Sequence, residues 1–95
     1  MYGVIRRYAN GGALAAGLQQ HRQEVQELIS GVPGFRHYSA VRSGDSVATI
    51  TICDAKAGAD ESSRRAREWV QKNLSGASVS APEITEGDLI LDFGA

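Results

Sequence analysis

The spacing of apolar residues along the chain switches between two periods, and the order of these switches predicts the order of strands and helices. Residues 2–8 are rich in β-branched and aromatic types and end at Asn10-Gly11-Gly12, which predicts a strand followed by a turn. Apolar residues then recur at three- and four-residue spacing, which is typical of an amphipathic helix. The members of this stripe are Leu14, Leu18, Val25, Leu28, Ile29 and Val32.

The ends of this helix carry their own signals. Asn10 or a glycine beside it is suited to open it, and Gly31 is suited to close it as a left-handed residue past the last turn. Pro33 prevents its continuation.

Two strand-like runs, 35–42 and 47–54, flank Ser43-Gly44-Asp45 and predict a β-hairpin. A three-residue loop would place Tyr38 and Ala40 beneath the helices, opposite Ile50 and Ala48, and we favour it because it makes that side apolar. A two-residue loop would shift the pairing by one residue and mix the two faces. With the three-residue loop, the opposite face carries Phe35, His37, Ser39, Val41, Val47, Thr49, Thr51 and Cys53.

The rest of the chain predicts one more helix and one more strand. A second helix is expected from about residue 60 to residue 74, capped by Asp60, with Ala66, Trp69, Val70 and Leu74 as its buried stripe. A polar connection, 75–81, ends at Pro82. The apolar run 89–93 is predicted to be the last strand.

Together these elements predict an α+β, ferredoxin-like βαββαβ fold in a single domain, residues 1–95. It has a four-stranded antiparallel sheet with both helices on one face, because right-handed crossovers place them on the same side. The other face stays uncovered and is too apolar for a plain solvent face, which indicates an interface or a ligand site. We therefore expect a homodimer whose interface includes Phe35, Val41, Val47, Thr49 and Thr51.

Composition and charge exclude several classes of function. A net charge of −1 argues against nucleic-acid or anionic-membrane partners, which need clustered Lys and Arg. The arginine groups 6–7 and 64–67 are interpreted as solvated or ion-paired surface residues. The single cysteine, Cys53, excludes an internal disulfide. No apolar run approaches membrane-spanning length and the start is too early charged for a signal peptide, so we expect a cytoplasmic protein.

Three segments carry a resemblance to a known family: Leu28-Ile29-Ser30-Gly31-Val32-Pro33-Gly34-Phe35, the Arg42-Ser43-Gly44-Asp45 hairpin, and Trp69 late in the second helix. With this layout the chain resembles the dimeric α/β-barrel superfamily and, within it, the antibiotic-biosynthesis-monooxygenase-like group. The resemblance implies that two protomers pack sheet to sheet, forming a dimeric α/β barrel. It also implies a pocket between the sheet and the helices of each protomer.

The resemblance further implies a cofactor-independent monooxygenase that acts on a small aromatic or polyketide-like substrate, with no cofactor and no metal. The alternative is a catalytically silent dimer of the same superfamily that binds a small organic ligand or has a structural role. Haem-degrading members carry Asn on the first strand and His on the second helix, and this chain has neither. An RNA-recognition module would need exposed aromatic residues on its central strands, and a metallochaperone would need paired cysteines; the chain has neither.

The candidate site residues follow from this layout. His37 is proposed as the catalytic base because imidazole titrates near neutral pH and lies beside Ser39 on a mixed polar face, opposite Thr51 in the favoured register. Tyr38, Trp69, Asn73 and Arg36 are expected to line the pocket between sheet and helices. His21, on the apolar stripe of the first helix, is interpreted as a half-buried core residue.

Overall fold

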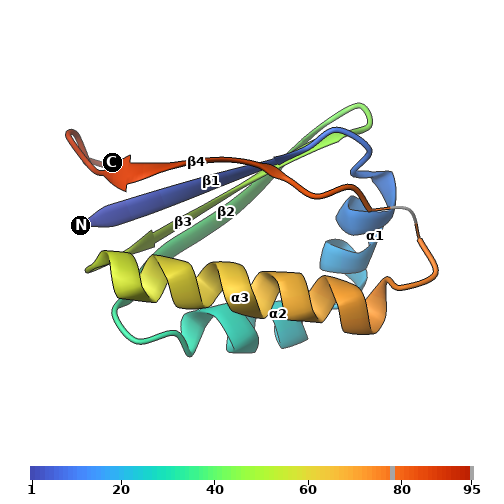
Figure 1. The fold of residues 1–95 in the computed structure, drawn as a ribbon, viewed down its shortest axis with the longest axis horizontal. Coiled ribbons are helices and arrows are strands. Elements are labelled where there is room, and N and C mark those ends of the chain that lie inside the picture. Colours follow the sequence, from blue (N-terminus) through green and yellow to red (C-terminus); the bar gives the residue numbers. More distant parts are fainter. Residues whose placement is uncertain (78, 95) are drawn as a thin grey trace.

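Four antiparallel strands form a sheet, and three helices cover one of its two faces (Figure 1). The computed structural model describes residues 1–77 and 79–94. The strands lie in the spatial order β2-β3-β1-β4. This is the α+β, ferredoxin-like architecture that the apolar pattern predicts. The elements are β1 (Tyr2–Tyr8), α1 (Gly12–Gln20), α2 (Arg22–Ser30), β2 (Phe35–Ser43), β3 (Ser46–Cys53), α3 (Lys56–Asn73) and β4 (Glu83–Asp88).

The first predicted helix is divided in two at His21, which has φ −109° and ψ 32°. Backbone hydrogen bonds still cross the junction, because the His21 N–H donates to the Gly17 carbonyl at 2.9 Å and the His21 carbonyl accepts from Val25 at 2.9 Å. The prediction that Gly31 ends the helix in a left-handed conformation is wrong, since its φ is −76°. The left-handed glycine is Gly34, with φ +76°, where the chain turns into β2 after Pro33.

The hairpin between β2 and β3 has a two-residue loop, so the favoured three-residue register is wrong. Ser43 pairs with Ser46, and Gly44 has φ +59° at the first position of the turn. Glycine with positive φ at that position, followed by a residue with negative φ, is the requirement of a type II′ turn, whose twist matches the strands. As a result Tyr38 lies opposite Thr51 instead of Ile50.

This shift changes which residues of β3 face the helices. Val47, Thr49, Thr51 and Cys53 are all buried beneath the helices, and Ala48, Ile50 and Ile52 lie on the uncovered face. The helix side is less uniformly apolar than the three-residue loop would have made it, because two threonines enter the core.

A bulge in β2 moves Phe35 to the helix side as well. The register shifts between Phe35, which lies opposite Cys53, and His37, which lies opposite Ile52. The extra residue, Arg36, reverses the alternation, so Phe35 packs against the core cluster. Of the five predicted interface residues, only Val41 lies on the uncovered face, where 56% of it is exposed. Placing Phe35, Val47, Thr49 and Thr51 there was wrong.

The last helix and the last strand both begin earlier than the sequence indicates. Helix α3 starts at Lys56, so Asp60 is not its cap; instead Asp60 accepts a hydrogen bond from Lys56 one turn before it. Strand β4 pairs with almost the whole length of β1, from Arg7 opposite Glu83 to Tyr2 opposite Asp88. The prediction of a strand at 89–93 is wrong because β1 has no further residues to pair with beyond Met1.

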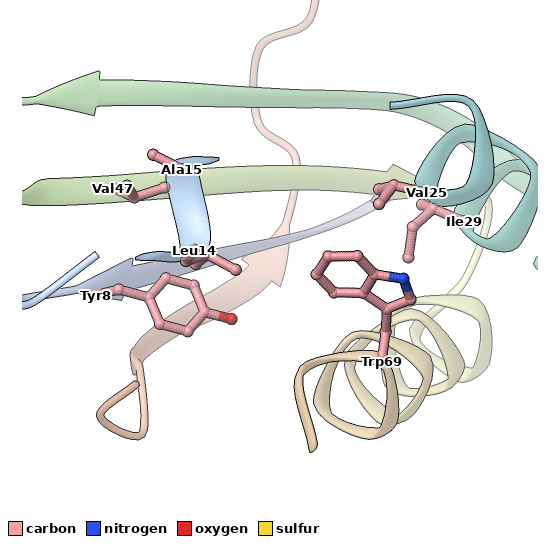
Figure 2. Packing of buried hydrophobic residues seen from close by; sticks show 7 residues of the cluster. All are labelled: Tyr8, Leu14, Ala15, Val25, Ile29, Val47 and Trp69. Atoms are coloured by element: carbon pink, nitrogen blue, oxygen red, sulfur yellow. The ribbon is translucent and has the colours of Figure 1, made fainter. Parts of the chain in front are cut away.

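The main core lies between α1–α2, α3 and the helix side of β1 and β3 (Figure 2). The Tyr8 ring from β1 and the Trp69 ring from α3 lie on either side of its centre, with Leu14 beside Tyr8. Among the described residues, no helix is long and apolar enough to cross a membrane. The buried members of the cluster are Tyr8, Leu14, Ala15, Val25, Ile29, Val47 and Trp69.

Candidate functional site

An arginine is buried in the middle of the sheet on the helix side. Arg6 is only 2% exposed and is flanked along β1 by Val4 and Tyr8, which are also buried. The interpretation of Arg6 as a surface or ion-paired residue is therefore wrong. The sequence did carry a signal for this burial. Alternate residues of a strand point to the same face, so Arg6, which lies between Val4 and Tyr8 at i−2 and i+2, is expected to face inward with them.

Hydroxyl groups surround the Arg6 guanidinium. Its Nη2 donates to Ser62 Oγ at 2.8 Å and to Ser63 Oγ at 2.9 Å, both on α3. Its Nη1 donates to Thr51 Oγ1 at 3.1 Å on β3. The nitrogens are thus satisfied by neutral acceptors, and Arg6 forms no ion pair with any described residue.

Electrostatics at this centre favour neutral phenols and a charged guanidinium. Burial lowers the pKa of Arg6, but arginine remains protonated in proteins. Burial also raises the pKa of Tyr8 and of Tyr38, and the Arg6 charge opposes this in both cases. At neutral pH the two tyrosines are therefore hydroxyl donors, not phenolate bases.

A small cavity lies next to Trp69, and we call it the Trp69 cavity. It has a volume of about 20 Å³, enough for one water-sized molecule. Tyr8, Tyr38 and Thr49 line it together with apolar side chains from α1, α2 and α3. Trp69 Nε1 is buried and has no hydrogen-bond partner among the described residues. Figure 2 shows this nitrogen directed toward Val25 and Ile29, which also line the cavity.

A larger groove, the α2–β2 groove, adjoins the Trp69 cavity. Its volume is about 530 Å³, which is in the range of small-molecule sites. The groove runs between the helices α1 and α2 and the edge strand β2. Leu18, Val25, Ile29 and Tyr38 line both hollows, so the cavity forms the inner end of the groove.

The structure brings most of the predicted pocket residues together here. Tyr38 lines both hollows, Trp69 lines the cavity, and Arg36 lines the groove, where it also pairs with Asp54 at 2.5 Å. Asn73 does not line either one; its Nδ2 donates to the Trp69 carbonyl at 2.9 Å and so stabilises the last turn of α3.

The two histidines occupy different places. His37 lines the rim of the α2–β2 groove, and its exposed ring is hydrogen-bonded through Nε2 to Ser39 Oγ at 2.6 Å, as the alternation along the strand predicts. It lies opposite Ile52, not Thr51. His21 packs edge-on against Trp69, with ring centroids 5.8 Å apart, and contacts Glu24 at 3.5 Å.

A second groove lies on the other side of α3, and we call it the α3–β4 groove. It has a volume of about 430 Å³ between α3, the 79–82 segment and the strands β1 and β4. Arg6 and Ser63 contribute to it, so the buried guanidinium lies at its inner end. Arg67 also lines it.

Within the described residues, no three His, Cys, Asp or Glu side chains come together in a group that could hold a metal ion. The single cysteine, Cys53, is fully buried, and burial raises the pKa of its thiol. It is therefore a small packed side chain and not a thiolate ligand.

Comparison of sequences finds no matching family model and no matching curated protein. Solved structures do match over almost the whole chain. NE2512, a protein of unknown function from Nitrosomonas europaea, has a TM-score of 0.73 at 15% identity, covering 99% of this chain and 93% of that one. A mutant of MhuD with two manganese protoporphyrin IX molecules bound per active site has a TM-score of 0.72 at 12% identity, covering 100% of both chains.

A third similar structure is a monooxygenase from the gene ActVA-Orf6 of Streptomyces coelicolor in complex with the ligand nanaomycin D. It has a TM-score of 0.70 at 14% identity, covering 99% of this chain and 91% of that one. At such low identity the likeness establishes the fold. The chain has a ferredoxin-like fold, which it shares with these structures and with a putative antibiotic biosynthesis monooxygenase from Chloroflexus aurantiacus at 16% identity.

Haem, which is bound by MhuD from Mycobacterium tuberculosis, does not fit the residues of this chain. A haem iron needs an axial side-chain ligand such as histidine. Helix α3 contains no histidine, His21 packs against the Trp69 ring, and the His37 Nε2 is bonded to Ser39 at the exposed rim of the groove. Neither histidine of the chain is therefore placed to bind a haem iron in a pocket.

Proposed function

We propose that this protein is a homodimer that binds a small aromatic or polyketide-like molecule in the α2–β2 groove and oxidises it with O₂ without a cofactor. The observation that carries the proposal is the Trp69 indole N–H, a buried donor with no partner among the described residues, at the inner end of a groove of about 530 Å³. An unpaired buried donor costs about 1–3 kcal/mol of stability, so its retention is consistent with an acceptor supplied by a ligand.

The chemistry requires a carbon acid and a group that stabilises its anion. A base removes a proton from an activated CH₂, the carbanion transfers electrons to O₂, and the CH₂ group becomes C=O with release of one water. The products balance as R₂CH₂ + O₂ → R₂C=O + H₂O. The Trp69 N–H and the neutral Tyr38 hydroxyl are donors suited to the developing oxyanion, because the surrounding cavity is mostly apolar and strengthens such bonds.

For the base we propose His37, because it is the histidine among the residues that line the groove. The buried tyrosines are poor bases at neutral pH, since burial raises the pKa of each. Histidine is the side chain that most often serves as a general base in enzymes, and the groove rim leaves its ring accessible to a bound molecule.

The uncovered sheet face supports the homodimer. Its centre is apolar, with Ile5, Val41, Ala48, Ile50 and Ile52 on adjacent positions of the three neighbouring strands. After β4, the residues Ile90, Leu91 and Phe93 are 92%, 77% and 89% exposed, which adds further apolar surface. Figure 1 shows the chain segment after β4 close to the N-terminus. We infer that this face is covered by the same face of a second copy of the chain, because two identical apolar surfaces can pack against each other about a two-fold axis.

The test uses purified protein with no added metal or flavin, an anthrone as substrate, and an oxygen electrode. The parent is expected to consume O₂ in step with the formation of the ketone. Trp69→Phe keeps an aromatic ring but removes the N–H, and we expect its rate to fall about tenfold or more, in keeping with the loss of one oxyanion donor.

His37→Ala and His21→Ala form the matched pair for the base, with folding checked by circular dichroism. A loss confined to His37→Ala supports the assignment. If no activated CH₂ compound is oxidised by the parent, but anthrones still quench the fluorescence of the single tryptophan, the silent ligand-binding alternative is correct. Full activity in Trp69→Phe would contradict the proposed site.

A further inference from the structure

The α3–β4 groove collects positive charge with no negative charge to balance it. Two guanidinium groups line it, those of Arg6 and Arg67, and no Asp or Glu is found among its lining residues in the described part of the chain. Neither arginine forms an ion pair with a described residue.

The other arginines of α3 do form ion pairs, so the lack of a carboxylate partner is specific to the arginines of the groove. Arg64 pairs with Glu61 at 2.7 Å and with Glu68 at 2.7 Å, and Arg65 pairs with Glu61 at 2.9 Å. The helix thus neutralises its arginines on the surface that faces away from the groove. It leaves Arg67 without a carboxylate on the surface that faces the groove.

The burial of the Arg6 charge is expected to lower the stability of the folded protein unless the charge has a function. A buried charge without a partner of opposite sign is destabilising, and hydrophobic replacements of buried ionic groups are often neutral or stabilising. The hydroxyls around Arg6 satisfy its N–H groups but carry no charge. An anion in the groove would supply the missing charge.

We propose that the α3–β4 groove binds a small organic carboxylate with an apolar body, whose carboxylate oxygens accept hydrogen bonds from Arg6 and Arg67. This site is separate from the α2–β2 groove and does not rest on the proposed oxidation there.

The shape and walls of the groove favour a carboxylate over an inorganic anion. Its volume of about 430 Å³ exceeds the space that a phosphate ion fills, and Val70, Val79 and Ile84 make much of the wall apolar. The planar fork of arginine matches the two oxygens of a carboxylate. Ser63 Oγ, which accepts from Arg6 Nη2 at 2.9 Å and from Nε at 3.3 Å, lines the same groove. Rotation of the Ser63 side chain about its Cα–Cβ bond would move Oγ away and leave these two donors to a ligand oxygen.

The first experiment titrates the full chain with benzoate at low ionic strength, using amide chemical shifts in NMR. We expect saturable shifts at residues around Arg6, Ser63 and Val79. Benzamide has the same size and shape as benzoate but no charge, and we expect it to bind at least tenfold more weakly. Inorganic phosphate is the third probe and is also expected to bind at least tenfold more weakly than benzoate.

Variants on α3 form a matched pair. Arg67→Gln removes a groove charge, and we expect the apparent Kd for benzoate to rise about tenfold. Arg64→Gln removes a charge from the same helix outside the groove and is expected to leave the Kd unchanged. Trp69→Phe, which alters the α2–β2 site, is expected to leave it unchanged as well, so failure of one proposal is distinguishable from failure of the other.

Arg6→Met tests the cost of the buried charge directly. We expect it to lose benzoate binding by tenfold or more, with a melting temperature no lower than that of the parent. Should Arg6→Met fail to fold, the Arg67→Gln and Arg64→Gln pair still decides the question. Equal affinity for benzoate and benzamide, equal affinity for benzoate and phosphate, or an unchanged Kd in Arg67→Gln would overturn the proposal.

Discussion

At the scale of single residues, the polar groups inside the core distinguish this protein from a plain α+β scaffold. Arg6 and Trp69 lie on the helix side of the sheet, one without a counter-charge and the other without an acceptor among the described residues. Trp69 was predictable from helical spacing, because Ala66 and Val70 share its stripe. Arg6 was missed because its charge was weighed more heavily than its position between two inward-facing residues of β1.

Trp69 is expected to contribute strongly to stability through packing. Trp69→Ala should lower the free energy of unfolding by roughly 3–5 kcal/mol, since a large buried side chain leaves a cavity when it is truncated. Trp69→Phe should cost less than half as much, because it keeps a ring and removes a buried N–H that has no partner among the described residues. Urea unfolding followed by far-ultraviolet circular dichroism measures both. Equal costs for the two variants would mean that the N–H has a partner in solution.

At the scale of elements, alternation and helical spacing predicted the helical segments and the first three strands, but not the last strand or how neighbouring strands align. The register of the hairpin depends on a turn of two residues, and the apolar pattern of 47–54 fits either face because threonine and alanine separate its larger residues. No residue type in the sequence indicated the bulge at Arg36, and this bulge determines the face of the sheet on which Phe35 lies. The last strand was misplaced because β-propensity at 89–93 exceeds that of 83–88, whereas the strand is defined by the length of β1.

The ion pairs on α3 predict a specific acid response. Hydrogen bonds from Arg64 and then Arg65 lower the pKa of Glu61 from 4.5 to about 2. Because the folded-state pKa is the lower one, the stabilisation by Glu61 is complete above pH 4.5 and is lost as the pH falls toward 2. A carboxyl titration by NMR should give a midpoint near 2 for Glu61 and a higher midpoint in Arg64→Gln. A midpoint in the parent close to the ordinary value of 4.5 would show that these pairs do not persist in solution.

At the scale of the whole molecule, the fold leaves one sheet face without a covering layer, and this was predicted from the order of elements. The residues on that face were mostly predicted wrongly, because the alignment of β2 with β3 decides which side chains point to each face. The corrected face carries Val41, Ile50 and Ile52 in place of Val47, Thr49 and Thr51. A substitution meant to disrupt the proposed dimer must therefore be made at Val41, which lies on the uncovered face.

Light scattering at micromolar concentration is expected to give twice the protomer mass of 10.1 kDa. Val41→Asp should shift the protein toward the monomer without lowering its helix content, because it introduces a charge into a desolvated contact. Val47→Asp is the contrasting variant: Val47 is 3% exposed beneath the helices, so the same charge should unfold the protomer. A parent that scatters as a monomer, or a Val41→Asp protein that stays dimeric, would contradict the sheet-to-sheet dimer.

The irregular edge of β2 has a bearing on filament formation. Open sheet edges are templates for adding foreign strands, and a bulge breaks the repeat of exposed N–H and C=O groups that such addition needs. Here the bulge at Arg36 interrupts the β2 edge, while the β4 edge is six residues long and carries Glu83, Glu86 and Asp88, whose like charges repel a second copy. Both edges therefore disfavour the addition of further strands, and the proposed dimer through the sheet face would remain a closed pair and would not extend into an amyloid-like fibre.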